Sequence, residues 1–200
     1  MVFQGDKVST KSTEIEGRAR TLANWQSICV ALIALCWSFF QLWYASPLPY
    51  LFKFGLFIDV PARAIHLTFA LTIAFLLFPA AKKLKFSHFN ASDILCSVVG
   101  AFCSLYLYLE YESLVDRNGV LLTKTVKIFD YLFFIPLELI IGGFGIILLL
   151  EATRRAIGLP LVIVAVVFLF YSFFGQIMPD VIAHRGLSIS RLIGYQWLGG

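Results

Sequence analysis

Five long apolar stretches constrain the fold of this chain more than any other feature of its sequence. They cover residues 27–45, 64–81, 94–109, 131–150 and 156–179. The hydrocarbon core of a bilayer is about 30 Å thick, and about 20 helical residues cross it. Four of the stretches are long enough for this. The third becomes long enough if it borrows flanking residues such as Ser92 and Tyr111.

The composition excludes the main classes of soluble protein. Hydrophobic residues make up 60% of the 200 residues and charged residues 14%, whereas about 25% of the residues of an average soluble domain are charged. The net charge of +4 is too small and too scattered for a nucleic-acid-binding surface, so no nucleic-acid partner is expected. The sequence predicts an all-α integral membrane protein with about five transmembrane helices and short interfacial or re-entrant segments on the outer side.

The distribution of lysine and arginine predicts a cytoplasmic N-terminus. In that orientation the inner segments carry Lys7, Lys11, Arg18, Arg20, Lys82, Lys83, Lys85, Arg154 and Arg155. The outer segments carry Lys53, Arg63, Arg117, Lys124, Lys127, Arg185 and Arg191. The inner loops are short and their basic residues are concentrated, which is where the positive-inside rule applies best.

The outer connections are more apolar than ordinary loops. Residues 46–62 are too few to span the bilayer and too apolar to lie in water, so we expect an interfacial or re-entrant segment. Residues 120–129 and 186–198 have a similar mixed character. In the last of these segments, Ser188 is placed to cap a short helix.

One acidic residue, Glu138, lies inside the fourth apolar stretch. Carboxylates inside membranes often mark ion pathways. However, Pro136 is a favourable first helical residue, and a glutamate two positions later lies in the first turn, where the helix dipole stabilises it. A helix over 136–155 would place Glu138 near the outer interface. This favours a structural role and leaves a conducting role open.

The rest of that helix combines glycines with a charged end. Three glycines, at 142, 143 and 145, allow a neighbour to approach closely. At the end of the helix, Glu151 can pair with Arg155 one turn later, and we expect it to neutralise only one of the two arginines. Arg154 and Arg155 suit both the helix C-terminus and the anionic inner leaflet. Anchoring and topology therefore explain Gly142, Glu151 and the arginines without catalysis.

No group of residues has the spacing of a metal or catalytic site. His66 follows Arg63 at the outer mouth of the second stretch, and His184 and Arg185 follow the last stretch. Neither histidine has a second ligand at partner spacing. The four cysteines form two pairs, each separated by seven residues and about 10 Å along a helix, which is too far for a disulfide within the helix. We expect no metal, no cofactor and no enzyme activity.

A set of residues along the chain is similar to a known family. The set is Arg63-x-x-His66-Leu67, Pro79, Asp93, Tyr106, Tyr111, Arg117-Asn118-Gly119, Glu138-x-x-x-Gly142, Leu150-Glu151-Ala152-Thr153-Arg154-Arg155-x-x-Gly158, Tyr171-x-x-x-Gly175, Pro179 and His184-Arg185-Gly186. It resembles the N-terminal part of fused TRAP transporter permeases, the tripartite ATP-independent periplasmic transporters, of the TAXI type. The resemblance covers residues 25–200. Glu138 departs from it, because the family usually has aspartate there.

The resemblance implies a multi-pass permease of a bacterial or archaeal inner membrane. A periplasmic solute-binding protein would deliver an organic anion, such as a carboxylate, for symport with sodium. Residues 1–24 would be a polar cytoplasmic tail, 25–155 a four-helix domain similar to the small membrane subunit, and 156–200 a fifth helix and outer segment leading to a large transport domain. That domain holds the sodium and substrate sites of the family.

On this reading the chain is a scaffold that does not transport alone and that contacts the transport domain, the binding protein and lipid. The alternative from a different class is a stand-alone membrane protein, either an assembly factor or an enzyme that uses Glu138 and His66. A neighbouring or continuous reading frame rich in glycine hairpins would favour the permease.

Overall fold

The computed structural model of the chain describes residues 19–80, 88–116 and 137–198. The lysine-rich loop around Lys82, the outer segment 120–129, Pro136 and most of the N-terminal tail lie outside these residues. Within them the regular structure is entirely helical. The predicted all-α class is therefore confirmed for the part of the chain that the structure describes.

Four helices in the described residues are long and apolar enough to cross a membrane. They are α2 (Asn24–Ala45), α4 (Asp59–Leu77), α5 (Ala91–Leu109) and the helix Leu159–Ile177, which consists of α8 (Leu159–Phe174) and the 3-10 turn η2 (Gly175–Ile177). A fifth helix, α7 (Leu137–Ala156), is 20 residues long but has charged residues near both ends. Its crossing of the membrane stays a prediction.

Short helices join or follow these long ones. α3 (Leu48–Phe52) lies between α2 and α4, α6 (Tyr111–Asp116) follows α5, and α9 (Ile189–Ile193) continues into the π-turn η3 (Gly194–Leu198). Ser188 caps α9 as expected, because its hydroxyl oxygen accepts a hydrogen bond from the backbone N–H of Arg191 at 3.4 Å. Tyr111 belongs to α6 and does not extend α5, so its predicted inclusion in the third span is wrong.

The helix boundaries follow from local chemistry. α4 begins at Asp59, five residues before the predicted apolar stretch, since an aspartate and a proline are both favourable in a first turn. It ends just before Phe78, which precedes Pro79 and is extended, as residues before proline prefer. Gly158, with a φ of 121°, separates α7 from α8.

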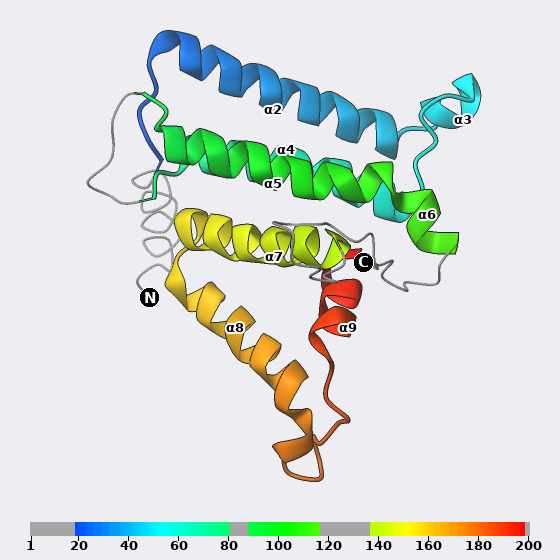
Figure 1. Cartoon of the computed structure of the whole chain (residues 1–200). Coiled ribbons are helices and arrows are strands. Elements are labelled where there is room, and N and C mark those ends of the chain that lie inside the picture. The colour runs from blue at the N-terminus through cyan, green and yellow to red at the C-terminus, as the bar shows by residue number, and fades with distance from the viewer. Residues whose placement is uncertain (1–18, 81–87, 117–136, 199–200) are drawn as a thin grey trace, which may run out of the picture.

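Helices α4, α5 and α7 form the centre of the molecule (Figure 1). Their shared core contains Ala64, Leu71, Phe75, Cys103, Leu107, Ile141 and Ala152, together with Ile193, Trp197 and Leu198 from the C-terminal segment. Only 6% of the apolar window of α2 and of the Leu159–Ile177 helix is buried, against 33% and 39% in α4 and α5. α2 and α8 are therefore the least buried of these four helices.

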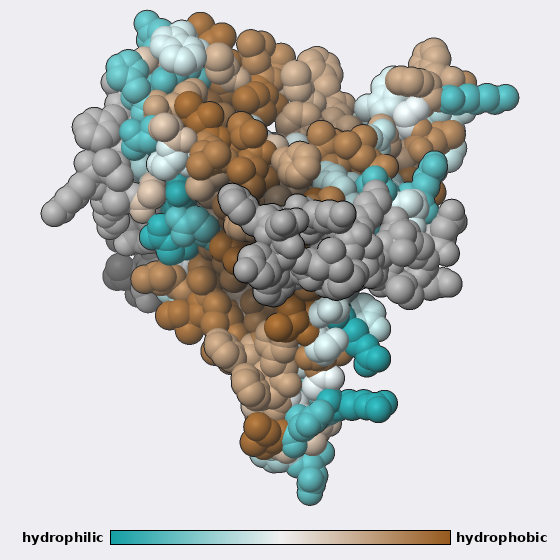
Figure 2. All heavy atoms as spheres, in the orientation of Figure 1, coloured by the Kyte–Doolittle hydropathy of each residue, from teal (hydrophilic) through white to brown (hydrophobic). Residues whose placement is uncertain are grey.

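Polarity changes along the helices as a membrane requires. Figure 2 shows apolar side chains over the middle of the helices and hydrophilic ones gathered near their ends. At the α3 end, Lys53 (φ 52°) and Gly55 (φ 66°) reverse the chain and leave Tyr50, Phe52 and Phe54 67–76% exposed. An exposed apolar segment too short to span agrees with the interfacial role that we predict for 46–62. The predicted end of this segment is wrong, because residues 59–62 belong to α4.

Candidate functional site

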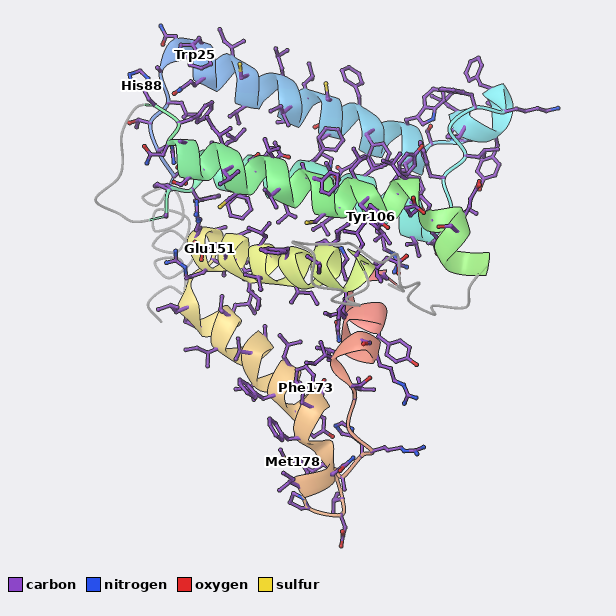
Figure 3. All side chains as sticks on the ribbon, in the orientation of Figure 1. Trp25, His88, Tyr106, Glu151, Phe173 and Met178 are labelled. Atoms are coloured by element: carbon purple, nitrogen blue, oxygen red, sulfur yellow. The ribbon has the colours of Figure 1, made fainter. Side chains whose placement is uncertain are left out.

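A cluster of five charged residues joins four separate parts of the chain at one end of the helix bundle. We call it the arginine–carboxylate cluster: Arg20, Asp93, Glu151, Arg154 and Arg155. Arg20 precedes α2, Asp93 lies in the first turn of α5, and the other three lie in the last turns of α7. Figure 3 shows this end, where Glu151 and His88 are labelled on the same side of the molecule.

Asp93 is the centre of the cluster and is fully buried. Its Oδ1 accepts a hydrogen bond from Nη1 of Arg155 at 2.7 Å, and its Oδ2 accepts one from Nη2 of Arg20. Both arginine side chains are buried as well, with 4% and 0% exposed. One carboxylate therefore links the segment before α2 to the last turn of α7.

Arg20 also holds the end of α4. Its backbone N–H donates to the carbonyl of Leu77 at 3.0 Å, and its Nη1 donates to the carbonyl of His88 at 2.9 Å. The Leu77 carbonyl lies in the last turn of α4, where the helix geometry leaves acceptors unpaired. The His88 carbonyl lies just before α5. Arg20 is therefore a tether and not a free part of a polar tail.

Glu151 binds both arginines of the α7 end. Its Oε1 accepts from Nε of Arg155 at 2.8 Å and from Nη2 of Arg154 at 2.7 Å, while Oε2 accepts from Nε of Arg154 at 2.7 Å. Glu151 therefore pairs with both arginines and not only with Arg155, although its single negative charge offsets only one of the two positive charges, as expected. Positions three and four residues later both lie on the face of Glu151, and two carboxylate oxygens serve both partners.

The two neighbouring arginines have different environments. The Arg155 guanidinium lies 5.0 Å above the ring of Phe75 and is buried between helices. Arg154 has 38% of its side chain exposed and reaches the carbonyl of Ala80 at 3.2 Å. The predicted role as an anchor at the lipid surface suits Arg154. For Arg155 it is wrong, because this side chain turns inward to Asp93.

The cluster acts as an electrostatic cross-link. Every carboxylate oxygen of Asp93 and Glu151 accepts a hydrogen bond from an arginine. Such pairing compensates the large desolvation penalty of buried charges, and removing one partner typically costs about 3–5 kcal/mol. In the sequence, Asp93 stands out only as part of the family resemblance and Arg20 only as one of the basic residues of the inner segments. A first-turn aspartate facing arginine-bearing ends was the signal that could have found them.

Glu138 does not belong to this cluster. It lies in the first turn of α7, thirteen residues and about 20 Å from Glu151, and it is 1% exposed. Gly142 and Gly145 follow on the same helix, and Ile193 and Trp197 lie directly over them. The expected close approach is therefore real, and the neighbour is the returning C-terminal segment.

His66 occupies a different place from the predicted one. Because α4 begins at Asp59, His66 lies about 10 Å inside the helix and not at its outer mouth. Its Nδ1 is 3.2 Å from Nε1 of Trp37 and 3.2 Å from Nε2 of Gln41, both on α2. Arg63 remains at the exposed end, 3.9 Å from Asp59.

His184 closes the loop that follows α8. Its Nδ1 accepts from the backbone N–H of Gly186 at 3.0 Å, and its Nε2 is 3.0 Å from the carbonyl of Tyr171. The carbonyl of Arg185 accepts from Gln176 at 2.6 Å. The His184-Arg185-Gly186 motif therefore has a structural geometry that ties the loop to the end of α8.

Among the described residues, no group of three or more His, Cys, Asp or Glu side chains could hold a metal ion. The four cysteines are free thiols. A scan against protein-family models and searches of curated proteins and of solved structures find no match to the chain.

Proposed function

We propose that this chain is the membrane scaffold part of a TRAP-type secondary transporter permease that takes up organic anions, such as carboxylates, with a sodium gradient. The observation that supports this function most directly is the arginine–carboxylate cluster. It joins the N-terminal segment, the ends of α4 and α7 and the start of α5 through buried ion pairs. A scaffold needs helices that are held rigidly together while an attached domain moves.

The outward surfaces suit the same role. α8 has no buried residue, so its apolar faces are open to lipid or to further helices. The resemblance places the large transport domain after this helix. In the proposed transporter, that domain carries the sodium and substrate sites and a periplasmic solute-binding protein docks on the outer side. The N-terminus is cytoplasmic and the membrane is the inner membrane of a bacterium or archaeon.

Uptake of labelled carboxylates by vesicles tests the transporter assignment. The chain is produced together with the adjoining transport domain, and the binding protein and a sodium gradient are supplied. We expect uptake that requires this chain and the inward sodium gradient. Uptake that persists without this chain, or that is indifferent to sodium, would contradict the proposal.

A second experiment tests the scaffold role separately. The hydroxyl oxygens of Thr68 on α4 and Ser104 on α5 are 2.9 Å apart. Cysteines at both positions can therefore form a disulfide between these two helices. If α4 and α5 stay together throughout the transport cycle, oxidation leaves the uptake rate unchanged. A loss of uptake on oxidation that a reductant reverses would show that these helices move apart.

A further inference from the structure

An exposed polar pair lies on the helices at a depth where a bilayer offers no hydrogen-bonding partner. His66 of α4 and Gln41 of α2 are both exposed and contact each other at 3.2 Å. His66 lies about 10 Å from the start of α4, and Gln41 about 6 Å from the end of α2. Both helices are long and apolar enough to span, so the pair lies within the apolar layer.

The indole of Trp37 decides which tautomer of the His66 ring fits this contact. Its N–H can only donate, and Nε1 is 3.2 Å from Nδ1 of His66. Nδ1 must therefore accept, which places the ring hydrogen on Nε2. Gln41 also donates to Nδ1, because its side-chain nitrogen and not its oxygen faces this atom.

Three hydrogen-bonding groups remain after these contacts: the Nε2–H donor of His66, the second N–H of the Gln41 amide and the Oε1 acceptor of Gln41. Within the described part of the chain, neither Nε2 of His66 nor Oε1 of Gln41 has a hydrogen bond. An unsatisfied polar group in hydrocarbon costs several kcal/mol, so membrane proteins pair such groups across helices. The Nε2–H donor of His66 and the Oε1 acceptor of Gln41 lie side by side, which makes the surface complementary to itself.

The surrounding surface permits close approach. Ala34, Ser38 and Ala45 lie on the same side of α2 as Gln41, within about 60° around the helix axis. Ser38 turns its hydroxyl back to the carbonyl of Ala34 at 3.0 Å and so adds no further unpaired donor. Small residues of this kind let transmembrane helices pack with their backbones near each other.

We propose that this face of α2 and α4 is the contact between two copies of the chain, related by a twofold axis along the membrane normal. Nε2–H of His66 in each copy donates to Oε1 of Gln41 in the other. A twofold axis brings the same surface of both copies together at the same depth, which the paired donor and acceptor require. The dimer forms with or without a transport domain and so does not depend on the proposed function.

Disulfide cross-linking of single-cysteine variants tests the contact surface. The four native cysteines are replaced by alanine in the full chain, which is reconstituted in phosphatidylethanolamine–phosphatidylglycerol vesicles. We expect Ser38→Cys to cross-link into a dimer and Phe39→Cys to stay monomeric. Phe39 is 62% exposed and lies at almost the same depth but about 100° around the helix. Equal cross-linking at both positions, or none at Ser38, would overturn the proposal.

A mixing experiment tests the polar pair itself. His66→Phe and Gln41→Leu each break both intermolecular bonds of a homodimer, and we expect the dissociation constant to rise about tenfold, or about threefold per bond. A mixed dimer of the two variants keeps one complete His66–Gln41 pair and replaces the other by an apolar contact. Energy transfer between labelled chains should therefore show the mixture associating more tightly than either variant alone. No recovery in the mixture would overturn the assignment of these bonds.

Discussion

Asp59 and Asp93 show how much the surroundings decide the role of a residue. Each lies in the first turn of a long apolar helix, where the helix dipole favours a carboxylate. Asp59 has 75% of its side chain exposed and faces Arg63 at 3.9 Å, a kind of pair that contributes about 0–1 kcal/mol. Asp93 is fully buried between Arg20 and Arg155. The same residue type at the same helical position is a surface charge in one helix and the centre of the cluster in the other.

The first prediction concerns this pair of aspartates. Asp93→Asn leaves two buried guanidinium groups without their shared counter-charge, so we expect a loss of about 3–5 kcal/mol of unfolding free energy. Asp59→Asn should lose less than about 1 kcal/mol. Unfolding of both variants in detergent, followed by circular dichroism, measures the difference. Equal stability of the two variants would show that the buried ion pairs do not hold the bundle together.

The neighbouring arginines give a second prediction at the same scale. Arg155→Gln removes a buried charge that binds Asp93 and Glu151 and lies over Phe75, so we expect a loss of about 3–5 kcal/mol. Arg154→Gln removes a half-exposed partner and should lose about 1 kcal/mol or less. The same unfolding measurement compares them. A larger loss of unfolding free energy for Arg154→Gln than for Arg155→Gln would mean that Arg154, and not Arg155, pairs with Asp93.

At the scale of helices, the sequence predicts position well and partners poorly. The apolar stretches locate α2, α5 and the helix Leu159–Ile177 to within a few residues, because the apolar content of a span is a local property. The start of α4 was missed because Asp59 and Arg63 interrupt the apolar run.

Contacts between helices depend on separations that no local pattern records. Arg20 and Asp93 are 73 positions apart, and the glycines of α7 indicated a close neighbour without showing that Trp197 provides it. Only the three-dimensional arrangement identifies these partners.

The third prediction concerns the contact between α7 and the returning C-terminal segment. A Cβ on Gly145 would lie 2.3 Å from Cζ2 of Trp197, so Gly145→Ala must displace a buried indole. We expect a loss of about 1–3 kcal/mol from overpacking. At Gly143 the nearest atom would be 3.7 Å away, so Gly143→Ala fits and should be neutral or stabilising by up to about 1 kcal/mol. Unfolding free energies and the fluorescence of Trp197 distinguish the two. A destabilised Gly143→Ala with an unaffected Gly145→Ala would contradict this packing.

At the scale of the whole molecule, the arginine–carboxylate cluster fixes the relative direction of the helices. It joins the segment before α2, the carbonyls at the end of α4, the start of α5 and the end of α7. These ends must therefore lie on the same side of the membrane, with α3 on the opposite side (Figure 1). The fold alone does not tell which side of the membrane this is; the positive-inside rule predicts that the cluster side is cytoplasmic.

The last prediction tests this orientation in intact cells with a maleimide that does not cross the membrane. Both labelled positions are exposed and lie at opposite ends of the bundle: His88 next to the cluster and Lys53 beside α3. In a chain whose own cysteines are replaced, we expect Lys53→Cys to react at once and His88→Cys to react only after permeabilisation. Labelling of both from outside would contradict the fold, because Arg20 holds the carbonyl of His88 at the end of the bundle away from α3. Reversed labelling would keep the fold and the cluster and would place the N-terminus outside.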